Sequence, residues 1–158
     1  MKYILMVVLV AVIMLISQGV CNQYRERCGL FEAISEFLGQ MRLNLTFQKQ
    51  KIKEILNRAT MRKSSKEIYT VYLNYLETGE SFDLSFVKVL EQSEQEQITN
   101  MLLSLGKNDV HGELQQLNAY ESYLKDKLQI AREERDKRCP LITKLSLLFA
   151  IGLAIVLI

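Results

Sequence analysis

Two long apolar runs, one near each end, are the clearest pattern in the chain. The first covers residues 3–21 and weakens toward its end, and the second covers residues 141–158 with Lys144 as its only charge. Eighteen helical residues span about 27 Å, close to the ~30 Å hydrocarbon thickness of a bilayer. The pattern therefore predicts transmembrane helices at residues 1–21 and 141–158, on either side of a middle domain of residues 22–140.

The first run also has features of a secretory signal peptide, since a lysine precedes an apolar core. The region where a signal peptidase would cleave does not fit this alternative, because no pair of small residues at the required spacing follows Ile16. A lipoprotein site would need a small residue before Cys21, and Val20 occupies that position. We therefore favour an uncleaved anchor over a cleaved signal.

Between the two runs, apolar residues recur at spacings of three and four, which is the period of an amphipathic helix. The first such stripe continues the first membrane helix outward and is followed by a break at Asn44-Leu45-Thr46. No alternating strand pattern extends beyond a few residues. The sequence thus predicts an all-α fold, a bundle of about six helices between the two membrane helices. The stripes lie in residues 24–41, 52–59, 68–76, 84–90, 98–105 and 110–131.

Several helix ends can be placed from capping residues. Ser64–Glu67 and Ser93–Glu96 have the spacing of a capping box and predict two helix starts. Gly79 is expected to end the helix that the first box opens. Gly106 can adopt the left-handed conformation that closes another helix, after which Asn108 or Asp109 can cap the next one.

The helix after this turn is the longest of the middle domain. About 30 residues, or roughly 45 Å of helix, separate the turn from Pro140, which suits the first turn of the terminal membrane helix. Four leucines of this helix are predicted to face the core, against a stripe of the first helix. The full apolar stripe is Val110, Leu114, Leu117, Leu124, Leu128 and Ala131. The expected partners of its four leucines are Ile34, Phe37, Leu38 and Met41.

The basic residues of the chain concentrate before the second apolar run. The net charge of +2 is too small to indicate a nucleic-acid partner. Cationic loops favour the cytosolic side, so the bias places the middle domain in the cytosol and the C-terminus outside. Arg25 and Arg27 agree with this orientation, and Lys2 weakly opposes it. We define the basic collar as Arg132, Arg135, Lys137 and Arg138.

No pattern in the chain indicates catalysis. His111 is the only histidine, and no cysteines or carboxylates surround it at metal-ligand spacing. The chain has no glycine-rich phosphate loop and no nucleophile elbow, and the glutamates of the long helix are typical of a solvated helix face. We expect a protein that is not an enzyme, and we assign no catalytic, cofactor-binding or metal-binding residue.

The three cysteines do not form an evident disulfide framework. Cys21 and Cys28 are seven residues apart, about 10 Å along a helix, and cannot form a disulfide without distortion. Cys139 could approach either of them if the two membrane helices pair. We interpret all three as reduced side chains at a helix interface. Asn44-Leu45-Thr46 has the form of a glycosylation acceptor, a triplet that often arises by chance.

The chain resembles the stage III sporulation protein AB family of endospore-forming bacteria. The resemblance is carried by Leu102–Asp109, by the helix with Ala131 and Glu133-Glu134, and by Leu145–Ile158. The Leu-Gly-x-x-Asp turn is its most specific part. The sequence departs from the family at Glu113, where a glutamine is usual. It also lacks any proline before Pro140, whereas the family commonly has a Thr-Pro turn after its first long helix.

The resemblance implies a non-catalytic platform or scaffold in a secretion-like channel complex between mother cell and forespore. Such proteins are similar to the inner-membrane platforms of type II secretion and type IV pilus systems, which dock a secretion-type ATPase. The implied location is the mother-cell membrane facing the forespore, as a multi-pass protein. The implied partners are that ATPase and other membrane components of the complex, and homo-oligomer formation stays open.

A cytosolic motor would first meet the end of the long helix farthest from the membrane. The candidate partner surface at that end is Lys107, Asn108 and His111. An alternative is that this turn only joins two helices, since its residues suit capping equally well. The alternative function is a general two-span adaptor or sensor, and an enzyme with an unrecognised site has no positive support.

Overall fold

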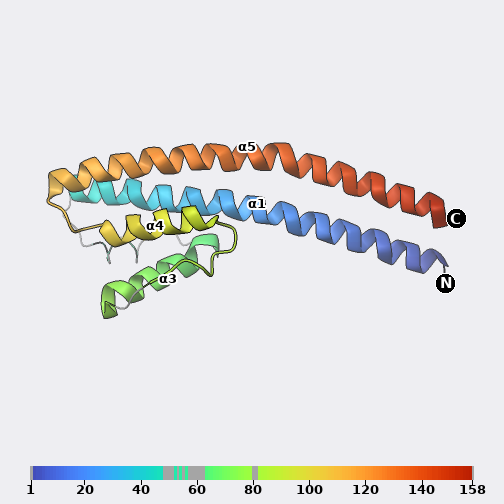
Figure 1. Ribbon diagram of the computed structural model, residues 1–158, viewed down its shortest axis with the longest axis horizontal. Helices are drawn as coiled ribbons and strands as arrows, with labels where there is room; N and C mark the ends of the chain where they lie inside the picture. The colour runs from blue at the N-terminus through green and yellow to red at the C-terminus, as the bar shows by residue number, and fades with distance from the viewer. Residues whose placement is uncertain are drawn as a thin grey trace. The chain divides into compact units, whose positions relative to one another are not determined.

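In the computed structural model, the regular elements of the described residues are all α-helices (Figure 1). The structure describes residues 2–47, 63–79 and 82–157, together with Ile52, Glu54 and Leu56. No strand occurs within these ranges, so the all-α class is confirmed. The helices are α1 (Lys2–Phe47), α3 (Lys63–Thr78), α4 (Gln92–Ser104) and α5 (Val110–Leu157).

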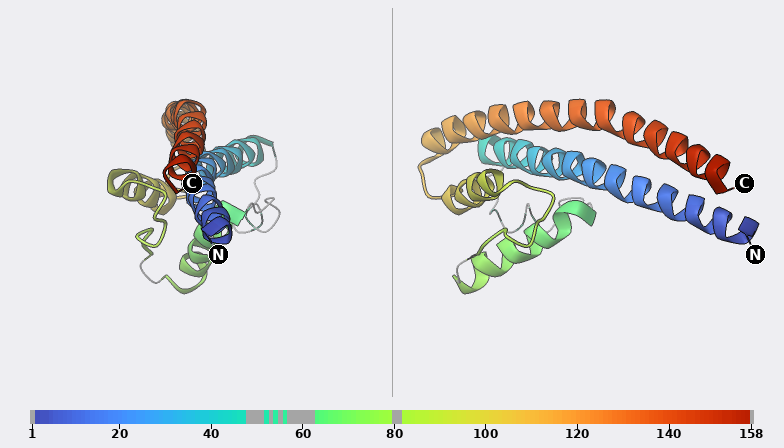
Figure 2. Two further views of the ribbon diagram at one scale, coloured as in Figure 1. Left: turned by 90° about the vertical axis from the view of Figure 1, so that its right-hand side faces the viewer. Right: turned by 45° about the vertical axis from the view of Figure 1, so that its right-hand side comes forward.

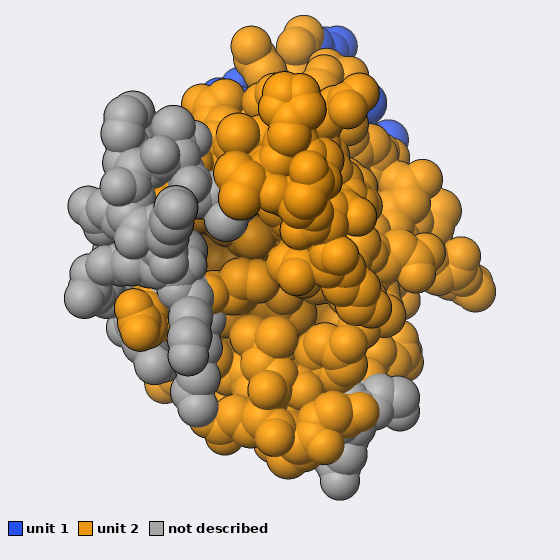
Figure 3. All heavy atoms as spheres, turned by 90° about the vertical axis from the view of Figure 1, so that its left-hand side faces the viewer, with its two compact units in different colours: residues 1–26, 130–158 blue, residues 27–129 orange. Residues whose placement is uncertain are grey.

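The chain divides into two compact units, coloured in Figure 3. The terminal unit contains Met1–Glu26 and Ile130–Ile158, and the central unit contains Arg27–Gln129. Both α1 and α5 are continuous helices that contribute one segment to each unit. The predicted continuation of the first membrane helix through residues 24–41 is therefore confirmed.

In the central unit, α1 is contacted by all three other helices (Figure 2). The Tyr69 hydroxyl of α3 donates to the Ala33 carbonyl at 2.8 Å, and the Tyr69 ring lies 5.7 Å from that of Phe37. Arg42 forms an ion pair with Glu121 of α5 at 3.1 Å. The predicted partner residues of α1, which are Ile34, Phe37, Leu38 and Met41, are at most 1% exposed, as expected of core residues. Leu30 and Phe31 of the same helix are fully buried as well.

The α5 stripe follows the prediction at its centre and departs from it at its start. Leu117 and Leu124 are fully buried, and Leu114 and Leu128 are half-buried. Val110 is 52% exposed, so its assignment to the stripe was wrong. It is the first residue of the helix, and Glu113 occupies the buried position in that turn instead, for a reason given below.

Two further helix predictions are corrected. Residues 84–90 are not helical but form successive turns, in which Val87 N–H donates to the Leu84 carbonyl at 2.9 Å. Asp83 competes with helix formation there by accepting from Ser85 N–H at 3.2 Å. The described residues contain four helices, and a count of six is not shown. Of the expected stripe at residues 52–59, Ile55 and Ala59 lie outside the described residues.

The helix ends predicted at two glycines are confirmed, whereas the helix starts predicted at two capping boxes lie at other residues. Gly79 ends α3 with φ of 74°, and Gly106 follows α4 with φ of 77°. The N-cap of α4 is Glu91, two residues before the predicted Ser93. Helix α3 begins at Lys63, so Ser64 lies inside it. Pro140 lies within α5 rather than in the first turn of a separate helix, because the chain stays helical through the collar.

Helix α1 contains a stretch that could cross a membrane. Val7–Asn44 has the required length and a mean hydropathy of 1.7 in its most apolar part, of which little is buried. It is the one such stretch among the residues that the structure describes. The expectation of an apolar N-terminal helix is thus confirmed.

Candidate functional site

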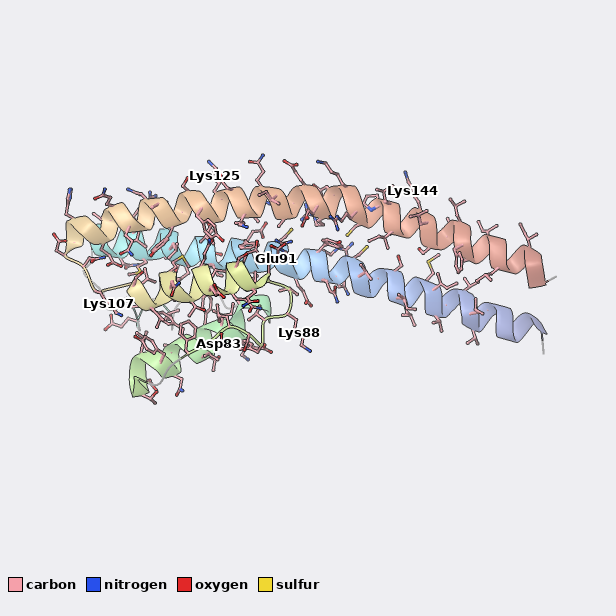
Figure 4. All side chains as sticks on the ribbon, in the orientation of Figure 1. Asp83, Lys88, Glu91, Lys107, Lys125 and Lys144 are labelled. Carbon is pink, nitrogen blue, oxygen red and sulfur yellow. The ribbon has the colours of Figure 1, made fainter. Side chains whose placement is uncertain are left out.

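The turn between α4 and α5 carries the predicted partner surface. Lys107, Asn108 and His111 are all exposed there, and Figure 4 shows Lys107 projecting from the turn. The structure therefore brings the three predicted residues together at one end of the central unit. An exposed surface of this kind can bind a partner but has no group positioned for catalysis.

Hydrogen bonds from both sides hold the backbone of this turn. Asp109 caps α5, because its Oδ1 accepts from Gly112 N–H at 3.2 Å, as the sequence predicted. Glu113 is 2% exposed, and its Oε1 accepts from Gly106 N–H at 2.9 Å. A side-chain Cβ at Gly106 would lie 2.9 Å from Cδ1 of Ile52, in a backbone conformation that favours glycine. The hydrogen bond from Gly106 N–H explains why Glu113 is buried, and a glutamine at position 113 would offer the same kind of acceptor oxygen.

A second polar cluster supports the turn from α4 and α5. The Gln116 amide donates to Ser104 Oγ at 3.0 Å and to the Tyr120 hydroxyl at 2.8 Å. Ser104 Oγ and the Tyr120 hydroxyl lie 3.0 Å apart. The Asn108 amide donates to Gln116 Oε1, which links the cluster to the exposed turn. The partner surface is thus presented on a backbone held by several bonds.

An ionic cluster that the sequence pattern did not predict connects three helices of the central unit. Glu94 of α4 is 0% exposed. Its Oε1 accepts from Arg27 of α1 at 2.9 Å and lies 3.1 Å from Lys127 Nζ of α5. Its Oε2 accepts from Glu91 N–H at 3.2 Å, which caps α4. The spacing of Glu91 and Glu94 could have indicated the cap, but no sequence signal indicated the two cations.

The charged groups of this cluster shift each other's pKa values. Burial acts to raise the pKa of Glu94, but hydrogen bonds from Lys127 and Arg27 outweigh it, so the pKa lies below its ordinary value. The hydrogen bond to Glu94 is the main cause of a raised pKa for Lys127. Both residues are therefore held in their charged forms, and the cluster ties α1, α4 and α5 together.

The basic collar lies in the terminal unit, and much of its charge is paired. Arg135 contacts Asp136 at 2.8 Å, Lys137 contacts Glu133 at 3.2 Å, and Arg138 Nη2 lies 3.7 Å from Glu134. Arg138 also donates to the Tyr24 hydroxyl at 3.1 Å and lies over the Tyr24 ring. Arg132 also has an interaction partner.

Polar contacts join α1 and α5 within the terminal unit. Ser146 Oγ donates to Ser17 Oγ at 3.2 Å. Cys21 Sγ lies 3.7 Å from the Cys139 carbonyl oxygen, and Cys139 Sγ lies 3.8 Å from that of Cys21. Cys139 thus approaches Cys21, one of the two options that the sequence allowed. All three cysteines are free thiols, and Cys28 is buried in the central unit.

A protein-family model matches almost the whole chain. Residues 2–158 match the family model described as stage III sporulation protein AB. No curated protein and no solved structure matches the chain. Within the described residues, no group of three or more His, Cys, Asp or Glu side chains could hold a metal ion.

Proposed function

Because the chain belongs to the stage III sporulation protein AB family, we propose that it is a platform component of a secretion-like channel complex between mother cell and forespore. Membership alone places its role in sporulation, and the family is not a known enzyme family. In the proposed role, the central unit docks a secretion-type ATPase from the cytosol and passes its action to membrane partners without catalysis of its own.

The observation that carries the proposal is the continuity of α5. This one helix of 48 residues begins at the Asp109 cap beside the partner surface and continues through the collar into the apolar C-terminal segment. At 1.5 Å per residue, it provides about 70 Å of helix. An ATPase bound at Lys107 and His111 would therefore act on the same helix that enters the membrane.

A second membrane span at the C-terminal end is part of this proposal. Leu145, Leu148 and Phe149 are each more than 60% exposed in the terminal unit, and Leu141 and Ile155 are exposed as well. Side chains of this kind are stable outside a core only where lipid or a partner covers them. The contact between Ser17 and Ser146 is typical of paired membrane helices, where small polar residues hydrogen-bond across the interface.

The basic collar supports a cytosolic position for the central unit. Cationic segments beside a membrane helix favour the cytosolic side. The collar ends at Arg138, three residues before Leu141, and Lys144 is the last charged side chain of the chain. The proposed location is the mother-cell membrane facing the forespore, with two spans and the C-terminus outside. Other membrane components of the complex are expected partners of those spans.

The docking step is tested by co-purification of the ATPase with the full chain. Lys107→Glu combined with His111→Glu reverses the charge of the partner surface without touching the bonds to Asp109 and Glu113. We expect this variant to lose most of the co-purified ATPase while keeping its far-UV circular dichroism. The matched control is Lys125→Glu, which changes an exposed lysine elsewhere on α5 (Figure 4). Equal ATPase recovery by all three chains would remove this surface as the docking site.

The alternative is a general two-span adaptor or sensor for another cytosolic partner. Gene neighbourhood separates the two functions. Genes for a secretion-type ATPase upstream and for membrane proteins downstream support the platform, and a source organism that forms no spores would contradict it.

A further inference from the structure

A cavity of about 450 Å³ opens between α1 and α5 within the terminal unit. It lies at the level where the basic collar meets the apolar segment of α5. Its walls combine apolar, polar and cationic side chains, and no carboxylate is among them. The lining residues are Gln18, Cys21, Arg25, Cys139, Pro140, Thr143 and Lys144.

The two cations of this cavity differ from those of the collar. The collar residues Arg135, Lys137 and Arg138 have carboxylate partners close by. Arg25 and Lys144 are exposed and have no ion-pair partner among the described residues. Lys144 projects outward from α5 (Figure 4) and is one of the residues that line the cavity. Arg25 and Lys144 are therefore two cations of the described part of this unit that can pair with an external anion.

The surroundings of the cavity indicate which anion it receives. Exposed apolar residues adjoin it on both helices, Leu15 and Ile16 before Gln18, and Leu145 and Leu148 after Lys144. A small inorganic anion would leave this surface uncovered, whereas acyl chains would cover it. Basic pockets between membrane helices on the cytosolic side are known to hold anionic headgroups.

We propose that this cavity is a binding site for an anionic phospholipid, such as phosphatidylglycerol or cardiolipin. The headgroup phosphate lies between Arg25 and Lys144, and the Gln18 amide supplies a hydrogen-bond donor to its oxygens. The acyl chains follow the apolar faces of α1 and α5. This inference rests on the two-span arrangement proposed above, and it explains a lysine in an otherwise apolar segment.

The test is native mass spectrometry of the full chain, purified in neutral detergent and mixed with phosphatidylglycerol or with phosphatidylcholine of the same acyl chains. Wild type should retain phosphatidylglycerol in preference to phosphatidylcholine. Combining Arg25→Gln with Lys144→Gln should weaken that retention by roughly 30-fold, about fivefold for each cation. Lys137→Gln, which removes a cation paired with Glu133 outside the cavity, should leave retention unchanged.

Three outcomes would overturn the proposal. One is equal retention of both lipids, and another is an equal loss of retention in the Lys137→Gln control. The third is complete displacement of phosphatidylglycerol by inorganic phosphate, which would show that the site recognises the anion alone.

Two added measurements separate this inference from the proposed function. Release of the wild-type chain from membranes by alkaline carbonate would contradict the two-span arrangement, and the lipid site with it. If the chain stays in the membrane and recovers the ATPase, but the double variant retains phosphatidylglycerol as wild type does, then only the lipid site is wrong.

Discussion

The central and terminal units use similar residues in opposite ways. Phe31 and Phe37 are at most 1% exposed in the central unit, whereas Phe149 of the terminal unit is 64% exposed. Leu117 is fully buried, but Leu148, on the same helix, is 65% exposed. The central unit therefore covers its apolar surface with its own helices, and the terminal unit presents that surface to its surroundings. This contrast supports the proposal that lipid covers the apolar surface of the terminal unit.

Polar groups show the same contrast. The central unit buries the carboxylate of Glu94 and compensates it with cations from two other helices. The terminal unit instead joins α1 and α5 by the hydroxyl pair of Ser17 and Ser146 and by an exposed contact between Arg138 and Tyr24, and its ion pairs lie on the surface. Surface pairs contribute little to stability, whereas breaking a buried pair is costly. Substitutions should therefore affect the two units very differently.

The largest difference is expected from matched leucine truncations on α5. Leu124→Ala removes a fully buried side chain and should lower the free energy of unfolding by roughly 2–5 kcal/mol. Leu148→Ala removes an exposed side chain and should change it by less than about 0.5 kcal/mol. Urea unfolding of the full chain in detergent, followed by circular dichroism, measures both. Equal effects would mean that the two segments of α5 are not in different environments.

A somewhat smaller loss is expected from Glu94→Ala. The substitution leaves Arg27 and Lys127 without their common carboxylate, at a cost of about 2–3 kcal/mol, because both cations remain partly in contact with water. Glu113→Ala is not a suitable control, because it removes the acceptor of Gly106 N–H in the turn between α4 and α5. Glu96→Ala, an exposed glutamate on the same helix, should leave unfolding nearly unchanged. If Glu94→Ala matches Glu96→Ala, the ionic cluster does not hold the three helices together.

The pH dependence of unfolding gives an independent check on the same cluster. The folded-state pKa of Glu94 lies below its unfolded value of 4.5, so its contribution is fully present above pH 4.5. It is then lost as pH falls through the lowered pKa of the folded state. Lys127 has a raised pKa, so its contribution is present below pH 10.5 and is lost as pH rises further. In the Glu94→Ala variant, the decrease in the free energy of unfolding below pH 4.5 should be smaller than in wild type.

The smallest effect is expected at the hydroxyl pair of the terminal unit. Ser17→Ala removes a hydrogen bond between α1 and α5, and such bonds between paired membrane helices typically contribute about 0.6 kcal/mol. The change should lie near the limit of detection in urea, and Ser17→Ala combined with Ser146→Ala should be no worse than either substitution alone. A loss as large as that of Leu124→Ala would contradict the view that lipid, rather than internal contacts, stabilises this unit.

The sequence predicted the central features of the fold because they follow from short-range patterns. Helical periodicity identified Leu117 and Leu124, and local backbone chemistry identified Gly79, Gly106 and Asp109 as helix ends. The prediction from sequence failed where polar side chains form hydrogen bonds that override the periodic pattern. Residues 84–90 contain apolar side chains near helical spacing, but Asp83 favours a turn at their start. Val110 fits the stripe, yet Glu113 takes the buried place because Gly106 N–H needs an acceptor.

The candidate sites show the same difference between patterns that are local in sequence and contacts between distant residues. Lys107, Asn108 and His111 could be grouped from the sequence because one turn holds them together, and their role as a partner surface stays a prediction. Glu94 was missed because its partners, Arg27 and Lys127, are 67 and 33 residues away. The cavity between Arg25 and Lys144 was missed for the same reason, since it exists only where α1 and α5 are paired. Contacts between distant segments are set by tertiary packing, which periodicity does not encode.

The central claim is that two membrane segments hold the central unit on the cytosolic side, and thiol labelling of intact cells tests it most directly. The three native cysteines are replaced by alanine, and a single cysteine is introduced either as Lys107→Cys or directly after Ile158. With a membrane-impermeant thiol reagent, we expect Lys107→Cys to be labelled only after lysis. The cysteine after Ile158 should be labelled in intact cells. Labelling of Lys107→Cys in intact cells would place the central unit outside and contradict the platform proposal.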